Sequence, residues 1–119
     1  MNRGEIWIAN LNPNKGTEPG KTRPVIIIQS DILNRVNHPS TLVIPLTSTI
    51  DPEPRTTTRL RITNRERLTS DSDALVDQVV AISNHRFKEG PVAALTAQEL
   101  LDIKEILDPI LGYYDQWTK

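Results

Sequence analysis

Short apolar stretches, separated by prolines and polar turn residues, form the main pattern along this chain. Five of them are rich in β-branched residues or alternate apolar with polar positions, and each is too short for a typical helix, so they predict strands. The predicted strands cover residues 5–9, 25–29, 41–46, 59–63 and 74–82. In the third strand Pro45 cannot donate a hydrogen bond to a neighbour, so we expect this strand near an edge or a bulge. In the fourth strand arginines alternate with apolar residues, which predicts that the arginine side chains face solvent.

Two segments show helical patterns instead. Residues 30–37 are compatible with one helical turn. Near the C-terminus, Thr96-Ala97-Gln98-Glu99 has the capping-box pattern that begins a helix, and apolar residues then recur at helical spacing. We therefore expect a helix over about residues 96–114, which Pro109 should end or kink. Together the elements predict a mainly β, mostly antiparallel fold, a small β-barrel or strongly bent sheet closed by one C-terminal amphipathic helix.

The length of 119 residues predicts a single domain over residues 1–119, with the β-rich part at about 3–95 and the helix at about 96–114. The chain has no cysteine, which excludes thiolate zinc sites, thiol catalysis and redox switching. Its only histidines, His38 and His85, lie in predicted turns and are too few for a histidine-rich metal cluster. We therefore expect no metal site and no cofactor.

The apolar runs are also too short for a membrane span. The longest aliphatic run, Val25–Ile28, falls far below the ~20 apolar residues that a spanning helix needs. The N-terminal residues lack the apolar region of a signal peptide. These features predict a soluble, cytoplasmic protein with no membrane contact.

Charge is balanced overall but unevenly distributed. Lysine and arginine number 14 against 15 aspartates and glutamates. The segment from Arg55 to Arg67 nevertheless carries five arginines and one glutamate, whereas the segment from Leu95 onward is acidic. The basic segment could follow a nucleic-acid backbone, or it could be an edge strand that charge protects against aggregation.

Three features have residue types suited to phosphate chemistry. Arg23 lies between a glycine-rich loop and a predicted buried strand, where a fixed guanidinium would suit a phosphate. Thr47-Ser48-Thr49 places hydroxyl groups at the end of a strand, where they could bind a phosphoryl oxygen. Glu18 lies five residues before Arg23 and could accept a proton or orient the arginine. The ordinary alternatives are a solvated loop arginine, a turn and a surface carboxylate.

Several blocks, taken in order and spacing, resemble one family. They are Arg3-Gly4-Glu5-Ile6-Trp7, the turn Leu11-Asn12-Pro13, the stretch Gly16–Val25, Pro45-Leu46-Thr47-Ser48 and Asp77-Gln78. Together they resemble the MazF/PemK (Kid) family of toxin–antitoxin ribonucleases. The resemblance implies an SH3-like β-barrel with a C-terminal helix, a homodimer, and a cognate antitoxin as partner. It also implies an mRNA interferase, which is a sequence-specific endoribonuclease that cleaves single-stranded RNA without a metal.

The resemblance implies catalytic roles for Arg23 and Thr47, and supporting or substrate-facing roles for Glu18 and Gln78. Without a metal, the ribose 2′-hydroxyl attacks the phosphate, and the products are a 2′,3′-cyclic phosphate and a 5′-hydroxyl. Arg23 would stabilise the charge, Thr47 would donate a hydrogen bond to a non-bridging oxygen, and Glu18 would act as the base. The residues expected to bind RNA are Lys21, Ser48, Arg55, Arg59, Arg61 and Gln78.

Two other classes of function remain open from the sequence. CcdB-like toxins resemble this family in fold but poison DNA gyrase through the C-terminal helix and its last residues. The present tail contains the aromatic residues Tyr113, Tyr114 and Trp117, which suit a protein contact or dimer packing. The second class is an inactive SH3-like binding module.

Overall fold

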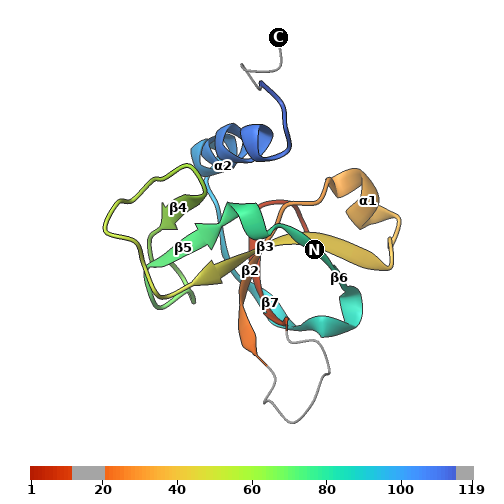
Figure 1. The fold of residues 1–119 in the computed structure, drawn as a ribbon. Coiled ribbons are helices and arrows are strands. Elements are labelled where there is room, and N and C mark those ends of the chain that lie inside the picture. The colour runs from red at the N-terminus through yellow and green to blue at the C-terminus, as the bar shows by residue number, and fades with distance from the viewer. Residues whose placement is uncertain (12–20, 115–119) are drawn as a thin grey trace.

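The computed structural model describes residues 1–11 and 21–114, so Glu18 lies outside the described residues. Within these ranges the chain forms strands, two α-helices and two short 3-10 turns (Figure 1). The strands are β1 (Glu5–Asn10), β2 (Thr22–Ile27), β3 (Ser40–Thr47), β4 (Arg59–Ile62), β5 (Ser72–Leu75), β6 (Val80–Ser83) and β7 (Phe87–Ala94). The helices are α1 (Asp31–Arg35) and α2 (Ala97–Ile110), and the 3-10 turns are η1 (Val76–Gln78) and η2 (Asn84–Arg86).

The strands pair in the order β4-β5-β3-β2-β1-β7, and β6 pairs with β3 off this path. Every pairing between the named strands is antiparallel. The predicted mainly β, antiparallel fold with a C-terminal helix is therefore confirmed. Closure into a barrel is not confirmed, because no strand pairing in the described residues joins β4 to β7 at the two ends of the order.

The position of Pro45 differs from the prediction. Strand β3 lies in the middle of the sheet, with β2 on one side and two strands on the other. Of those two, β6 pairs with residues 40–43 and β5 with residues 46–47. Ile44 and Pro45 pair only with β2, so the proline lies where the ladder on the other side of β3 is interrupted. An interrupted ladder tolerates a missing N–H donor, which is why a proline occurs in a central strand.

One prediction about the strands was wrong, and one strand was missed. The predicted strand over residues 74–82 is divided into β5 and β6 by the turn η1. Strand β7 was not predicted, because Gly90-Pro91 in its middle reads as a turn. The pairing of β7 with β1 shifts register on both sides of Ile8, and a Cβ atom on Gly90 would lie 2.3 Å from Cδ2 of Trp7. The glycine therefore allows the irregular strand to pass directly against the indole ring.

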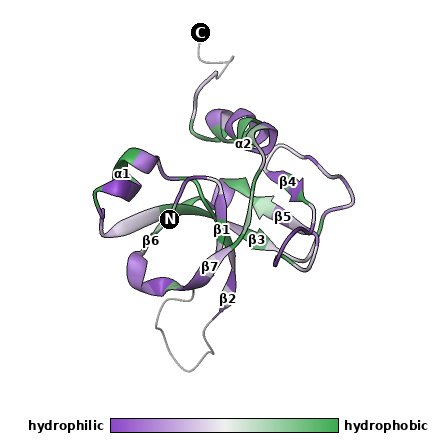
Figure 2. Cartoon of the chain, turned by 180° about the vertical axis from the view of Figure 1, so that it is seen from behind, coloured by the Kyte–Doolittle hydropathy of each residue, from purple (hydrophilic) through white to green (hydrophobic). Residues whose placement is uncertain are grey.

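The apolar residues of the central strands pack on both sides of the sheet. Ile26 and Ile44 belong to a large cluster that also contains Ile103 and Ile106 of α2. Val25, Ile27 and Val43 belong to a second cluster, packed against Trp7 and Phe87. This division follows from the alternation of side chains along a strand and confirms that residues 25–28 lie in the core. Figure 2 shows the hydrophobic colouring concentrated in the central strands and on the inner side of α2.

Helix α2 begins as the sequence predicts. The Thr96 hydroxyl accepts from the Glu99 amide at 3.1 Å, and a Glu99 carboxylate oxygen accepts from the Thr96 amide at 2.8 Å. Pro109 lies in the last turn, and the helix ends at Ile110. In the described part of the chain, neither helix is both long enough and apolar enough to cross a membrane.

Candidate active site

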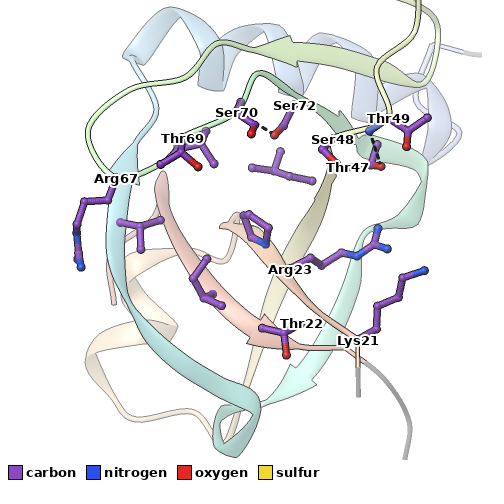
Figure 3. A pocket seen from close by; sticks show the side chains of 15 residues that line it. Lys21, Thr22, Arg23, Thr47, Ser48, Thr49, Arg67, Thr69, Ser70 and Ser72 are labelled. Atoms are coloured by element: carbon purple, nitrogen blue, oxygen red, sulfur yellow. Dashed lines mark hydrogen bonds between the residues drawn. The ribbon is translucent and has the colours of Figure 1, made fainter. Parts of the chain in front are cut away.

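A pocket of about 530 Å3 opens beside the ends of β2 and β3 and is bordered by the loop between β4 and β5 (Figure 3). Its apolar wall consists of Ile8, Pro24, Leu46, Leu68 and Val92. Its polar residues are Lys21, Thr22, Arg23, Thr47, Ser48, Thr49, Arg67, Thr69, Ser70 and Ser72. A buried apolar wall with polar groups around it is the usual form of a ligand-binding pocket, and this volume is within the usual range.

Arg23 is the half-buried cation of this pocket. It lies on β2 opposite Ala9 of β1, whose small, buried side chain leaves room beside it. No hydrogen bond or ion pair joins the Arg23 side chain to another residue among those described. Figure 3 shows this side chain extending toward the end of the pocket that holds Thr47 and Ser48. A partly buried guanidinium without an internal partner is available to bind an anion.

Thr47 is the last residue of β3, and its hydroxyl is oriented by the backbone that follows it. The Thr47 Oγ1 atom accepts a hydrogen bond from the amide of Thr49 at 3.2 Å. Because a hydroxyl can accept and donate at the same time, the Thr47 hydrogen remains free to bind a ligand oxygen in the pocket. Ser48 follows and is exposed on the pocket rim.

The buried carboxylate of Asp73 belongs to β5, next to the end of β3 that carries Thr47. Asp73 on β5 is 0% exposed and is paired in the sheet with both Thr47 and Arg61. It accepts hydrogen bonds from Arg61 Nε at 2.7 Å, from the Asp51 amide at 2.7 Å and from Arg59 Nη1 at 3.3 Å. Burial alone would raise the pKa of Asp73, but hydrogen bonds, chiefly from Arg61, lower it below its ordinary value.

Sequence reasoning missed Asp73, although a signal for it exists. Arg59 and Arg61 are two residues apart on one strand, so their side chains share a face of the sheet. Two arginines on one face of a strand that is buried at its other positions require a nearby acid. Asp73 is the acidic residue at the start of the next strand. The prediction that these arginines face solvent was wrong, since the Arg61 side chain is only 18% exposed.

The structure brings some predicted RNA-binding residues to the pocket and places others elsewhere. Lys21 and Ser48 line the pocket, together with the predicted catalytic Arg23 and Thr47. Four others are not among its lining residues: Arg55, Arg59, Arg61 and Gln78. Contact between these four residues and RNA stays a prediction.

The basic and acidic segments noted in the sequence bind each other. Arg55 forms ion pairs with Asp102 at 3.4 Å and with Glu105 at 3.0 Å, and Arg65 pairs with Glu99. These contacts attach the basic segment to helix α2. Much of its positive charge is therefore neutralised within the molecule. Two pocket cations outside this segment, Lys21 and Arg23, have no ion pair with another of the described residues.

The described residues include no group of three or more histidine, aspartate or glutamate side chains arranged to hold a metal ion. The groups that the pocket offers to a ligand are therefore hydroxyls, cations and an apolar wall. These groups suit an anionic ligand that also carries an apolar or aromatic part.

Comparison with known proteins gives one consistent result. Residues 2–111 match a family described as PemK-like, MazF-like toxin of type II toxin-antitoxin system. The chain is 30% identical over 115 residues to Endoribonuclease MazF of Staphylococcus saprophyticus, covering 96% of this chain and 93% of the relative. A MazE-MazF structure from Deinococcus radiodurans matches with a TM-score of 0.75 at 20% identity, covering 94% of this chain and 96% of that chain. An endoribonuclease in complex with its cognate antitoxin, from mycobacterial species, matches with a TM-score of 0.71 at 18% identity, covering 94% and 95%.

Proposed function

Because the chain belongs to the family of PemK-like, MazF-like toxins of type II toxin–antitoxin systems, we propose that it is an endoribonuclease that cleaves single-stranded RNA in the pocket around Arg23 and Thr47. The observation that carries the proposal is the half-buried Arg23 guanidinium. It has no partner among the described residues and extends toward the Thr47 end of the pocket. A partly buried cation and a directed hydroxyl are suited to bind a phosphate as negative charge develops on it.

In the proposed reaction, the ribose 2′-oxygen forms a bond to phosphorus while the bond from phosphorus to the 5′-oxygen breaks. Arg23 stabilises the charge on the non-bridging oxygens, and Thr47 donates a hydrogen bond to one of them. Arginine remains protonated at neutral pH, so it suits charge stabilisation rather than proton removal. Glu18 is the proposed base that takes the 2′-hydroxyl proton. The leaving 5′-oxygen takes up a proton, delivered by Arg23 or by solvent. The products are therefore a 2′,3′-cyclic phosphate and a 5′-hydroxyl, and the reaction requires no metal.

The rest of the pocket would bind the RNA around the cleaved phosphate. Lys21 is exposed at the start of β2 and Ser48 at the end of β3, so both are placed to contact phosphate oxygens. The apolar wall offers a surface for a base or ribose. The sequence-specificity of cleavage would then depend on the residues around this wall.

Two assembly proposals accompany the activity. The first is an SH3-like barrel closed by backbone contacts between the β4–β5 loop and β7. It is supported by the Arg67 amide, which donates to the Val92 carbonyl at 2.9 Å. The second is a homodimer, supported by exposed apolar residues on α1 and directly after it, where Ile32 is 72% and Val36 68% exposed. A mass near 13 kDa alone in light scattering at micromolar concentration would contradict the dimer.

A cognate antitoxin is the proposed protein partner. A solved relative is an endoribonuclease in complex with its cognate antitoxin. By analogy, a segment of such a partner would inhibit this chain if it covered the pocket opening. Loss of RNA cleavage when this chain is mixed with the antitoxin at a fixed molar ratio would support this proposal, and unchanged cleavage would contradict it.

The deciding experiment for the function uses purified protein, single-stranded RNA and excess EDTA. We expect cleavage with cyclic-phosphate and 5′-hydroxyl ends. A parallel supercoiling assay with DNA gyrase separates this function from gyrase poisoning, and intact RNA with unaffected gyrase would point to a binding module. Cleavage that stops in EDTA and returns with added metal would contradict the metal-independent reaction.

A further inference from the structure

The backbone segment that follows Thr47 is held by a charged cluster around one buried carboxylate. The cluster consists of Asp73 with Arg59 and Arg61, and is called here the Asp73 cluster. Asp73 lies between its two sheet neighbours, Thr47 on β3 and Arg61 on β4. Its position therefore connects the strand end that carries the Thr47 hydroxyl with the strand that carries the two arginines.

Each member of the Asp73 cluster also binds the backbone of residues 49–51. The Asp73 carboxylate accepts from the Asp51 amide at 2.7 Å. Arg59 Nη1 donates to the Thr49 carbonyl at 3.1 Å, and Arg61 Nη2 donates to the Asp51 carbonyl. Three contacts thus fix both the donor and acceptor groups of a short loop that has no regular secondary structure.

This loop in turn fixes the catalytic hydroxyl. Arg59 holds the carbonyl of Thr49, and the amide on the other side of the same Cα atom donates to Thr47 Oγ1 at 3.2 Å. When a hydroxyl accepts a hydrogen bond on one side, its own O–H bond points in a different direction. The direction of the Thr47 hydrogen therefore depends on the position of the Thr49 amide, and that depends on the Asp73 cluster.

We propose that Asp73, acting through Arg59 and the backbone of residues 49–51, is a positioning residue that directs the Thr47 hydroxyl toward the RNA phosphate. This inference rests on the proposed endoribonuclease function. It also assigns Arg59 and Arg61 a role that does not require contact with RNA.

Stability alone does not account for this arrangement. Moving charges into a protein interior is costly, and apolar residues of similar volume often stabilise a fold at least as well as a buried ion pair. Apolar residues could not form the hydrogen bonds by which the N–H and carboxylate groups of the Asp73 cluster hold defined backbone atoms. A catalytic group needs a defined position, because small errors in its placement reduce the reaction rate strongly.

The first test replaces the carboxylate by an amide of nearly the same shape, Asp73→Asn. The expected result is a loss in kcat of roughly 10- to 100-fold with little change in KM, measured in steady-state cleavage of RNA. The matched control is Glu99→Gln, which breaks the Arg65–Glu99 ion pair and touches no residue of the loop at 47–51. Both variants are assayed at a temperature where circular dichroism shows them folded. Equal losses of kcat in the two variants would overturn the proposal.

A double-mutant cycle with Thr47→Ala tests the route of the effect. If Asp73 acts by directing the Thr47 hydroxyl, Asp73→Asn should reduce kcat by no more than about twofold once that hydroxyl is absent, because residues that act as one unit are not additive. A full additional loss in the Thr47→Ala background would overturn the proposal. If the wild-type chain does not cleave RNA at all, the proposed function fails instead, so the two failures are distinguishable.

Arg59→Gln provides a second variant in case Asp73→Asn does not fold. It removes the contact to the Thr49 carbonyl while the Arg61–Asp73 ion pair remains. A positioning role predicts a lower kcat at unchanged KM, whereas direct binding of RNA by Arg59 predicts a raised KM that depends steeply on salt. A change in KM alone would overturn the proposal.

Discussion

Replacing Arg23 by alanine should separate an effect on catalysis from an effect on folding. Arg23 is half-buried at the pocket and forms no hydrogen bond or ion pair with another described residue. Its removal therefore leaves no buried group without a partner, and changes of that kind usually alter stability by about 0.5 kcal/mol or less. For a domain of this size we expect the melting temperature to fall by under about 3 °C.

Activity should fall far more than stability. Arg23→Ala removes one pre-positioned donor from the oxygens on which charge develops, and the loss of such a donor typically costs about 100- to 1000-fold in rate, or about 2.7–4 kcal/mol. Arg23→Lys should recover little of this rate, because an ammonium group cannot make the planar two-point contact of a guanidinium. The expected effect on activity is thus several times larger in free energy than the expected effect on folding.

The assay is single-turnover cleavage of a fluorogenic single-stranded RNA in EDTA, with enzyme in excess and equal folded concentrations. The control is Lys88→Ala, which also removes one positive charge but lies exposed on β7 and outside the pocket lining. His85→Ala, in the turn η2, should likewise retain activity. If Arg23→Ala cleaves RNA at the wild-type rate, or if Lys88→Ala loses as much activity, the assignment of Arg23 is refuted.

Three further results are expected. Thr47→Ala should lower the cleavage rate by about 100-fold while the melting temperature stays nearly constant, and a rate within twofold of wild type would exclude Thr47 as a donor. Gly90→Ala should destabilise the fold by about 1–3 kcal/mol in urea unfolding, because its Cβ would lie 2.3 Å from the Trp7 ring; an unchanged midpoint would contradict that close approach. Hydrogen bonds from arginine lower the pKa of Asp73 and Glu99 despite the opposing effect of burial, so the folded state binds fewer protons than the unfolded state. The resulting stability should be complete above about pH 5 and decline as pH falls further; a urea midpoint that is constant from pH 7 to pH 3 would contradict this.

Local patterns were enough to predict the elements whose structure depends on nearby residues. The capping box at Thr96 and Glu99 depends only on contacts three residues apart, and the helix begins where they predict. Strand β7 was missed because Gly90-Pro91 reads locally as a turn, and its strand conformation depends on pairing with β1, which lies near the start of the chain. The position of Pro45 in a central strand likewise depends on where β5 and β6 meet β3, which no local pattern records.

Some residues of the candidate site could likewise be predicted from local sequence patterns, and others could not. Arg23 and Thr47 were predicted from their motifs, and the structure places both on one pocket. The Asp73 cluster was missed because a sequence shows that arginines and acids are present but not which of them pair. The arginines of residues 55–67 were expected to face solvent or nucleic acid, yet Arg55 and Arg65 bind acidic residues of α2 and Arg61 binds Asp73.

The pairing of β1 with β7 has a consequence for how the protein is made. The pocket wall contains both Ile8 and Val92, so residues from the beginning and the end of the β-rich part must be present together before the pocket exists. During translation at about 5–20 residues per second, these two residues leave the ribosome roughly 4 to 17 seconds apart. A nascent chain that still lacks β7 therefore has no complete pocket. If this pocket is the site of RNA cleavage, as proposed, the nascent chain cannot cleave RNA before β7 has been synthesised.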